Sequence, residues 1–195
     1  MIYTRNTPTL DTPVLIDQAL AEIGTTLLAG LSWLDKAYGK CQRLVELGEG
    51  GQRLVSPFVY VGAADQAGEY LGLFPDESVG NFCFFDMEDN ESIEWNAGIT
   101  SRHIVTFGLI FWFDFREVYP VNHLTRTAEN VKADVLQILH TKPLTLSAVR
   151  PAGFVDRVEN IYAGFNHREI EKQFLMRPFG GFRLNGELRF DQPCI

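Results

Sequence analysis

One stretch of alternating side chains dominates the sequence, and it covers residues 102–117. Read with a period of two, one set of side chains points to the same side: Val105, Phe107, Leu109, Phe111, Phe113 and Phe115. The opposite side holds Ile104, Thr106, Gly108, Ile110, Trp112, Asp114 and Arg116. Alternation of aromatic and β-branched residues predicts a β-strand, and this one is much longer than the roughly 5–6 residues of a usual strand.

The two faces of this strand differ in character. The first is apolar throughout, so we expect it to face a core. The second is apolar in the middle and charged at the end that holds Asp114 and Arg116. Such a face suits a covering layer from the same chain or the surface of a partner. We take Ile104, Ile110 and Trp112 as a candidate subunit-contact face.

Two helices follow from apolar residues that recur at spacings of three and four. The first should be capped by Asp11 or Thr12, with Pro13 in its first turn. It should pack through one stripe: Ile16, Leu20, Ile23, Leu27, Leu31 and Leu34. The second should run from a cap at Thr125 or Thr127 to about His140. Its buried stripe should be Ala128, Val131, Val135, Ile138 and Leu139.

Shorter strands should surround the long one. We expect them at 40–46, 52–62, 70–74, 81–87, 92–95 and 144–150, with a glycine-rich reversal at 48–51 and an acidic turn after 87. Helical spacing recurs at 155–162, and residues 166–169 resemble a capping box. This order predicts an α+β fold: a mixed or mostly antiparallel sheet with two main helices packed on one face. We expect a single domain over residues 1–195, with residues 1–11 as a polar N-terminal arm.

The C-terminal run is compatible with two structures. Asn185 and Gly186 form a typical hairpin turn, but such a turn would place apolar side chains opposite charged ones. One continuous strand instead puts five residues on one face: Phe182, Leu184, Gly186, Leu188 and Phe190. The alternation therefore favours a single strand with an irregularity at the glycine.

The net charge of −8 disfavours binding to nucleic acid or anionic lipid through a basic surface. Residues 1–140 carry nine basic and nineteen acidic side chains, whereas residues 141–195 carry eight and six. Between Arg53 and Arg102 there are nine acidic residues and no basic one. This asymmetry is typical of a solvated acidic face, or of head-to-tail attraction between copies that would favour a ring. Asp17, Glu22 and Asp35 in the most apolar helical segment argue against a membrane span.

No catalytic, cofactor-binding or metal-binding pattern is present, so we do not expect an enzyme. The cysteines (Cys41, Cys83 and Cys194) are odd in number and widely spaced, as in a reducing compartment. The histidines (His103, His123, His140 and His167) lie on different expected elements. The acidic run 86–91 lacks the glycine that a calcium loop needs at its sixth position. Asp114 and Glu117 would fall on opposite faces of a strand, which excludes a carboxylate pair.

Four motifs and the order of elements resemble the tail terminator and tail completion proteins of long-tailed bacteriophages and prophages. The motifs are residues 37–44 (AYGKCQRL), 57–60 (PFVY), 74–76 (FPD) through 80–82 (GNF), and 174–182 (FLMRPFGGF), and they look like those of Bacteroidetes prophage proteins. The resemblance covers nearly the whole chain. It implies a small α/β protein with helices on one face of the sheet.

The resemblance also implies a structural virion protein that caps the tail tube or joins tail to head. Its partners would be other copies of itself in a homo-oligomeric ring, for which a hexamer is one expected size, and tail-tube or head-completion proteins. Neither sequence-specific nucleic acid nor a membrane is expected as a partner. The protein would be cytoplasmic in the bacterial host and then part of the virion. The alternative is a small-molecule-binding module or an enzyme whose site is assembled from dispersed residues.

Overall fold

The computed structural model describes residues 15–47, 51–60, 70–75, 79–96, 100–165 and 176–193. The expected polar arm, the cap before Pro13 and the capping box at 166–169 lie outside these residues. The elements in chain order are α1 (Ile16–Gly30), β1 (Lys36–Lys40), β2 (Gln42–Leu47), β3 (Arg53–Tyr60), β4 (Tyr70–Gly72), β5 (Phe82–Asn96), β6 (Thr100–Asp114), α3 (Phe115–Val118), α4 (Ala128–Thr141), β7 (Ser147–Val155), α5 (Val158–Ile161) and β8 (Phe179–Pro193).

The long strand β6 lies at the centre of a five-stranded sheet with the order β1-β5-β6-β8-β7. Strand β1 is parallel to β5, and the other pairs are antiparallel. All fifteen residues of β6 pair with β8, from Thr100 opposite Pro193 to Asp114 opposite Phe179. The predicted α+β fold with a mixed, mostly antiparallel sheet is confirmed, and so is the continuous C-terminal strand.

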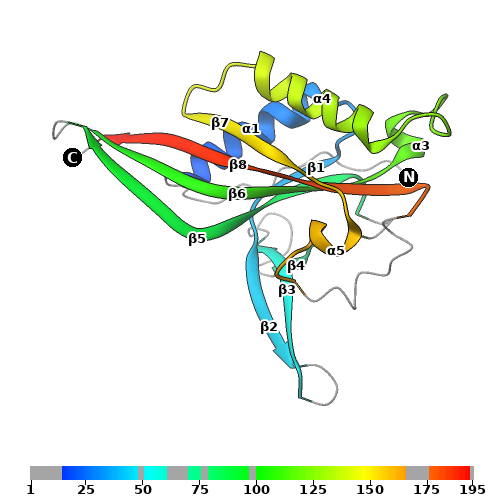
Figure 1. Cartoon of the computed structure of the whole chain (residues 1–195), viewed down its shortest axis with the longest axis horizontal. Coiled ribbons are helices and arrows are strands. Elements are labelled where there is room, and N and C mark those ends of the chain that lie inside the picture. Colours follow the sequence, from blue (N-terminus) through cyan, green and yellow to red (C-terminus); the bar gives the residue numbers. More distant parts are fainter. Residues whose placement is uncertain are drawn as a thin grey trace.

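Helices α1 and α4 cover one face of this sheet (Figure 1). The core between these helices and the sheet contains the expected residues of β6: Val105, Phe107, Leu109, Phe111 and Phe113. From α1 it receives Leu20, Ile23 and Leu27, and from α4 Val131 and Val135. Each of these residues is at most 4% exposed. The helical stripes and the apolar strand face therefore pack against one another as their periodicities predict.

The second face of β6 is covered by the same chain, which contradicts the proposed subunit-contact role of Ile110 and Trp112. These residues are 0% and 1% exposed. Over them lie a second sheet of order β2-β3-β4 and the short helix α5, on the side of the main sheet opposite α1 and α4 (Figure 1). Ile104 lies farther along the strand and is half-buried. Of the two alternatives for this face, a layer of the same chain or a partner, the structure shows the layer of the same chain.

Three local predictions were wrong. Strand β5 runs through the expected acidic turn, with only a shift of register between Met87 and Glu91. Strand β1 had no alternating pattern and was not expected. The long strand ends at Asp114, whose side chain accepts a hydrogen bond from the Arg116 N–H and opens helix α3. The last residues of the predicted strand are therefore helical.

Candidate interaction surface

The far half of the main sheet projects beyond the two helices. It consists of residues 92–96 of β5, 100–104 of β6 and 189–193 of β8, and we call it the distal sheet (Figure 1). Ile93 pairs with His103 and Trp95 with Ser101, so both apolar side chains lie on the face that α1 covers nearer the centre of the sheet. Ile93 is 48% exposed and Trp95 72% exposed. The distal sheet thus carries an aromatic surface that the described helices do not cover.

A polar network lies beside this aromatic surface. Nδ1 of His103 is 2.5 Å from Oε1 of Glu91, and Nε2 is 3.1 Å from the hydroxyl of Ser101. Because a carboxylate only accepts hydrogen bonds, Nδ1 carries a proton and donates to Glu91, and Nε2 lies within hydrogen-bond distance of the Ser101 hydroxyl. The imidazole also stacks on Phe190, with ring centres 5.0 Å apart. Ser, His and Glu are therefore ordered as in the triad of a serine hydrolase.

The surroundings of this network do not suit a hydrolase. Ser101 is 5% exposed and His103 7% exposed, so a substrate carbonyl has no approach to the hydroxyl. Along this stretch β6 is paired with β5 on one side and β8 on the other. Its backbone N–H groups are used in these ladders and cannot form an oxyanion hole. The network instead fixes the positions of the three strands close to Trp95.

The opposite face of the distal sheet is charged. Arg102 of β6 donates two hydrogen bonds to Asp191 of β8, at 2.9 and 3.1 Å. These bonds hold the pKa of Asp191 below its usual value. Glu94 is paired with Arg102 in the ladder and is exposed. The distal sheet therefore has one aromatic face and one face of solvated charges.

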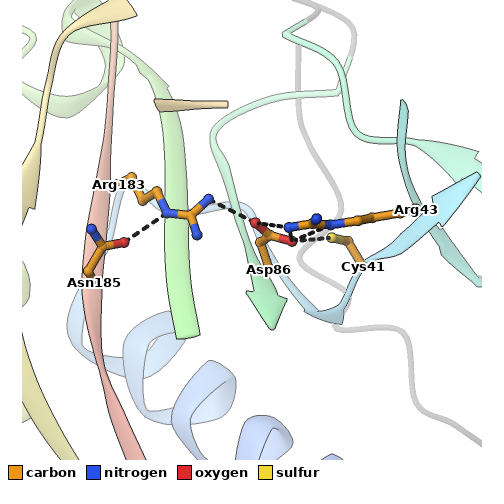
Figure 2. A network of polar contacts seen from close by, with 5 residues as sticks. All are labelled: Cys41, Arg43, Asp86, Arg183 and Asn185. Atoms are coloured by element: carbon orange, nitrogen blue, oxygen red, sulfur yellow. Dashed lines mark hydrogen bonds and ion pairs between the residues drawn. The ribbon is translucent and has the colours of Figure 1, made fainter. Parts of the chain in front are cut away.

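A buried ionic network joins the two sheets where the distal half begins (Figure 2). Asp86 of β5 is 1% exposed and accepts from Arg183 at 2.8 Å and from Arg43 at 2.9 Å. Figure 2 shows the two guanidinium groups reaching the carboxylate from opposite sides. Arg183 extends from β8 across β6 at Gly108, where an added Cβ would lie 2.2 Å from Nε. The glycine is therefore required for this close approach.

Asp114 and Glu117, which a continuous strand would separate, line one hollow together. Its other lining residues are Gly80, Asn81, Trp112, Arg116 and Phe179. Desolvation, with Asp35 and Asp114 nearby, raises the pKa of Glu117. Both carboxylates have partners in the same chain, because Arg116 donates to Asp114 and the Asn81 amide donates to Glu117. The hydrogen bonds of these lining residues therefore stabilise the turn from β6 to α3, and neither carboxylate is free to act as a catalytic group.

The thiols described by the structure are unreactive. Cys41 and Cys83 are 4% and 0% exposed. Burial raises the pKa of Cys41 to about 12 and that of Cys83 further still. Both thiols are therefore protonated at neutral pH and are poor nucleophiles. Within the described ranges, no three or more His, Cys, Asp or Glu side chains gather to hold a metal ion.

The aromatic surface of the distal sheet was not among the site residues expected from the sequence. The sequence predicts Trp95 at the end of a short separate strand, and the alternation of side chains does not show where α1 stops covering the sheet. His103 and Ser101 lie two residues apart and so share a face, but their link to Glu91 depends on the register shift in β5.

Comparison with known proteins does not assign the chain to a family. No protein-family model matches it, and no curated protein matches it. Among the described residues, no helix is both long and apolar enough to span a membrane. The surface features above are thus the basis for a functional proposal.

Proposed function

We propose that the protein is a structural component of a phage or prophage virion, a tail terminator, tail completion or head–tail joining protein that acts as a homo-oligomeric ring. The observation that carries this proposal is the distal sheet, which extends past its helices and exposes Trp95 and Ile93 side by side. Isolated apolar residues are common on surfaces, but an exposed tryptophan on a projecting, rigid sheet is typical of a contact site.

The rigidity of the distal sheet supports an assembly role. Ile110 and Trp112 are enclosed, so in this proposal the contact between copies lies at the distal sheet and not at the middle of β6. The distal sheet is held rigid by paired strands and by the Asp86 ion pairs. A rigid projection loses little conformational entropy when it docks.

The acidic residues between Arg53 and Arg102 also suit a channel through which DNA passes. Nine acidic residues and no basic one lie between Arg53 and Arg102. Carboxylates repel phosphates, so a ring lined by this part of the chain would let DNA slide without adhering. In this proposal the partners are other copies of the chain and tail-tube or head-completion proteins, and no catalytic step is involved.

Light scattering and negative-stain microscopy test this function on the purified full chain. We expect a concentration-dependent oligomer whose mass is a whole multiple of 22.0 kDa and whose images are rings. The exposed aromatic surface is the reason, because burying it between copies removes apolar area from water. A strictly monomeric protein at high concentration, both alone and with tail components, would contradict the proposal.

A further inference from the structure

One strand of the distal sheet is paired on its inner side only. Strand β1 pairs with β5 from Phe82 to Phe85, whereas the ladder between β5 and β6 continues to Asn96. In Figure 1 the outer half of β5 borders the sheet, with β6 and then β8 on its inner side. Among the described residues, no strand pairs with the outer side of residues 92–96, which we call the free edge. The backbone N–H and C=O groups of such an edge can pair with another strand.

The opposite border of the main sheet is protected against such pairing. Strand β7 forms this border and contains Pro151, which has no N–H to donate. The register of its ladder with β8 also shifts between Pro151 and Gly153. Prolines and irregularities of this kind hinder the addition of a strand to an edge. The free edge of β5 has neither, because residues 92–96 contain no proline and keep a regular register with β6.

The side chains of the free edge alternate between two faces. Ile93 and Trp95 lie on the aromatic face, and Glu94 lies on the charged face in line with Arg102 and Asp191. Arg102 donates its two described hydrogen bonds to Asp191. Glu94 is exposed and interacts with Arg102 through charge, but it accepts no hydrogen bond within the described part of the chain. A cationic side chain on an added strand would therefore give Glu94 a hydrogen-bond donor of opposite charge.

The same carboxylate disfavours a second copy of β5 as the added strand. Pairing of two free edges about a two-fold axis is antiparallel. Registers that bring Ile93 and Trp95 of both copies onto one face also bring the two Glu94 side chains onto the other face, directly or diagonally opposite each other. Like charges in opposite positions destabilise a ladder. The free edge thus fits a cationic strand better than its own copy.

We propose that the free edge of β5 binds an extended segment of a partner protein as an added β-strand, and that basic and apolar residues alternate in this segment. The basic side chains of the segment lie beside Glu94, and its apolar side chains extend the face that carries Ile93 and Trp95. Strand addition gains affinity from backbone hydrogen bonds and specificity from alternate side chains. This inference goes beyond the proposed ring, because the segment occupies the border of the distal sheet and not its aromatic face.

Capped synthetic peptides test this binding on the full chain. The probe is acetyl-TVKVKVT-amide. Its controls are TVEVEVT, which has the opposite charge, and TVKPKVT, in which a central proline interrupts strand pairing. Calorimetric titration up to millimolar concentration should detect binding of the probe and of neither control. Amide hydrogen exchange should slow at residues 92–96 when the probe is bound, because its backbone then covers the free edge.

A single substitution should reverse the charge preference. Glu94→Lys should weaken binding of TVKVKVT by about tenfold, since attraction between opposite charges becomes repulsion between like charges. The same variant should bind TVEVEVT more strongly than the parent does. Arg150→Glu is the matched control, because the Arg150 side chain is 73% exposed on the protected border, and it should leave binding of both peptides unchanged. Circular dichroism checks that both variants are folded.

Three results would overturn the proposal. The first is failure of TVKVKVT to bind, or equal binding of either control peptide. The second is equal affinity of the parent and the Glu94→Lys protein for TVKVKVT, which would remove the role of Glu94. The third is slowed exchange confined to residues outside 92–96, which would place the peptide elsewhere on the molecule.

Discussion

Replacing Asp86 with alanine should lower the free energy of unfolding by about 3–5 kcal/mol, the usual cost of leaving a buried charge without its partner. The Arg183 side chain is 8% exposed, and without Asp86 its remaining partner among the described contacts of this network is the Asn185 amide oxygen at 2.8 Å. Arg43 is 44% exposed and can turn toward water. Most of the destabilisation should therefore come from Arg183, held in place over Gly108.

Asp191→Ala is the matched control, because it removes a carboxylate that also pairs with an arginine. That pair is solvent-exposed, with side chains 43% and 52% exposed, so its loss should cost at most about 1 kcal/mol. Chemical denaturation of dilute protein measures both variants without a contribution from assembly. Equal losses in the two variants would show that the Asp86 network is not a buried structural link.

Trp112→Ala should also lower the free energy of unfolding by about 3–5 kcal/mol, the range for removing a large aromatic side chain from a core. Trp112 is 1% exposed and packs against Phe82 and Phe179, with ring centres 5.8 and 5.4 Å apart. It lies in the core that the main sheet shares with β3 and α5. Its removal should therefore weaken the packing of the second layer against the main sheet.

The same substitution at Trp95 serves as the comparison. Because Trp95 is 72% exposed, Trp95→Ala should leave the stability of the dilute protein nearly unchanged and should weaken assembly instead. Denaturation curves and light scattering on both variants measure the two effects. A Trp112→Ala protein as stable as the parent would contradict the enclosed position of this residue.

The period-two pattern of β6 predicts the strand and its two apolar faces. The helical spacing of the segments that form α1 and α4 predicts the apolar stripes that pack against one of these faces. The pattern of β6 does not show what covers Ile110 and Trp112, because the covering residues come from distant segments: β3 and α5, which meet only through tertiary contacts. The acidic composition after Met87 is typical of a turn. In the structure the pairing of β5 with long neighbouring strands overrides that local preference.

One signal of the buried network was present in the sequence. Gly108 interrupts an otherwise apolar and aromatic strand, and such a glycine often marks a close approach of another group. That group is Arg183, which lies 75 positions later and reaches Asp86 only because β5, β6 and β8 are adjacent. The order of strands was needed to connect the three residues, and alternation alone does not provide it.

Acrylamide quenching of tryptophan fluorescence tests most directly whether another copy covers the distal sheet. The Trp95→Phe variant keeps the other two tryptophans, Trp33 and Trp112, so the difference in quenching between the parent and this variant isolates the signal of Trp95. We expect strong quenching of Trp95 in dilute monomer and a loss of that quenching when the protein is concentrated enough to assemble. Equal quenching of Trp95 in dilute monomer and in the assembled state would show that the exposed aromatic surface is not a contact between copies.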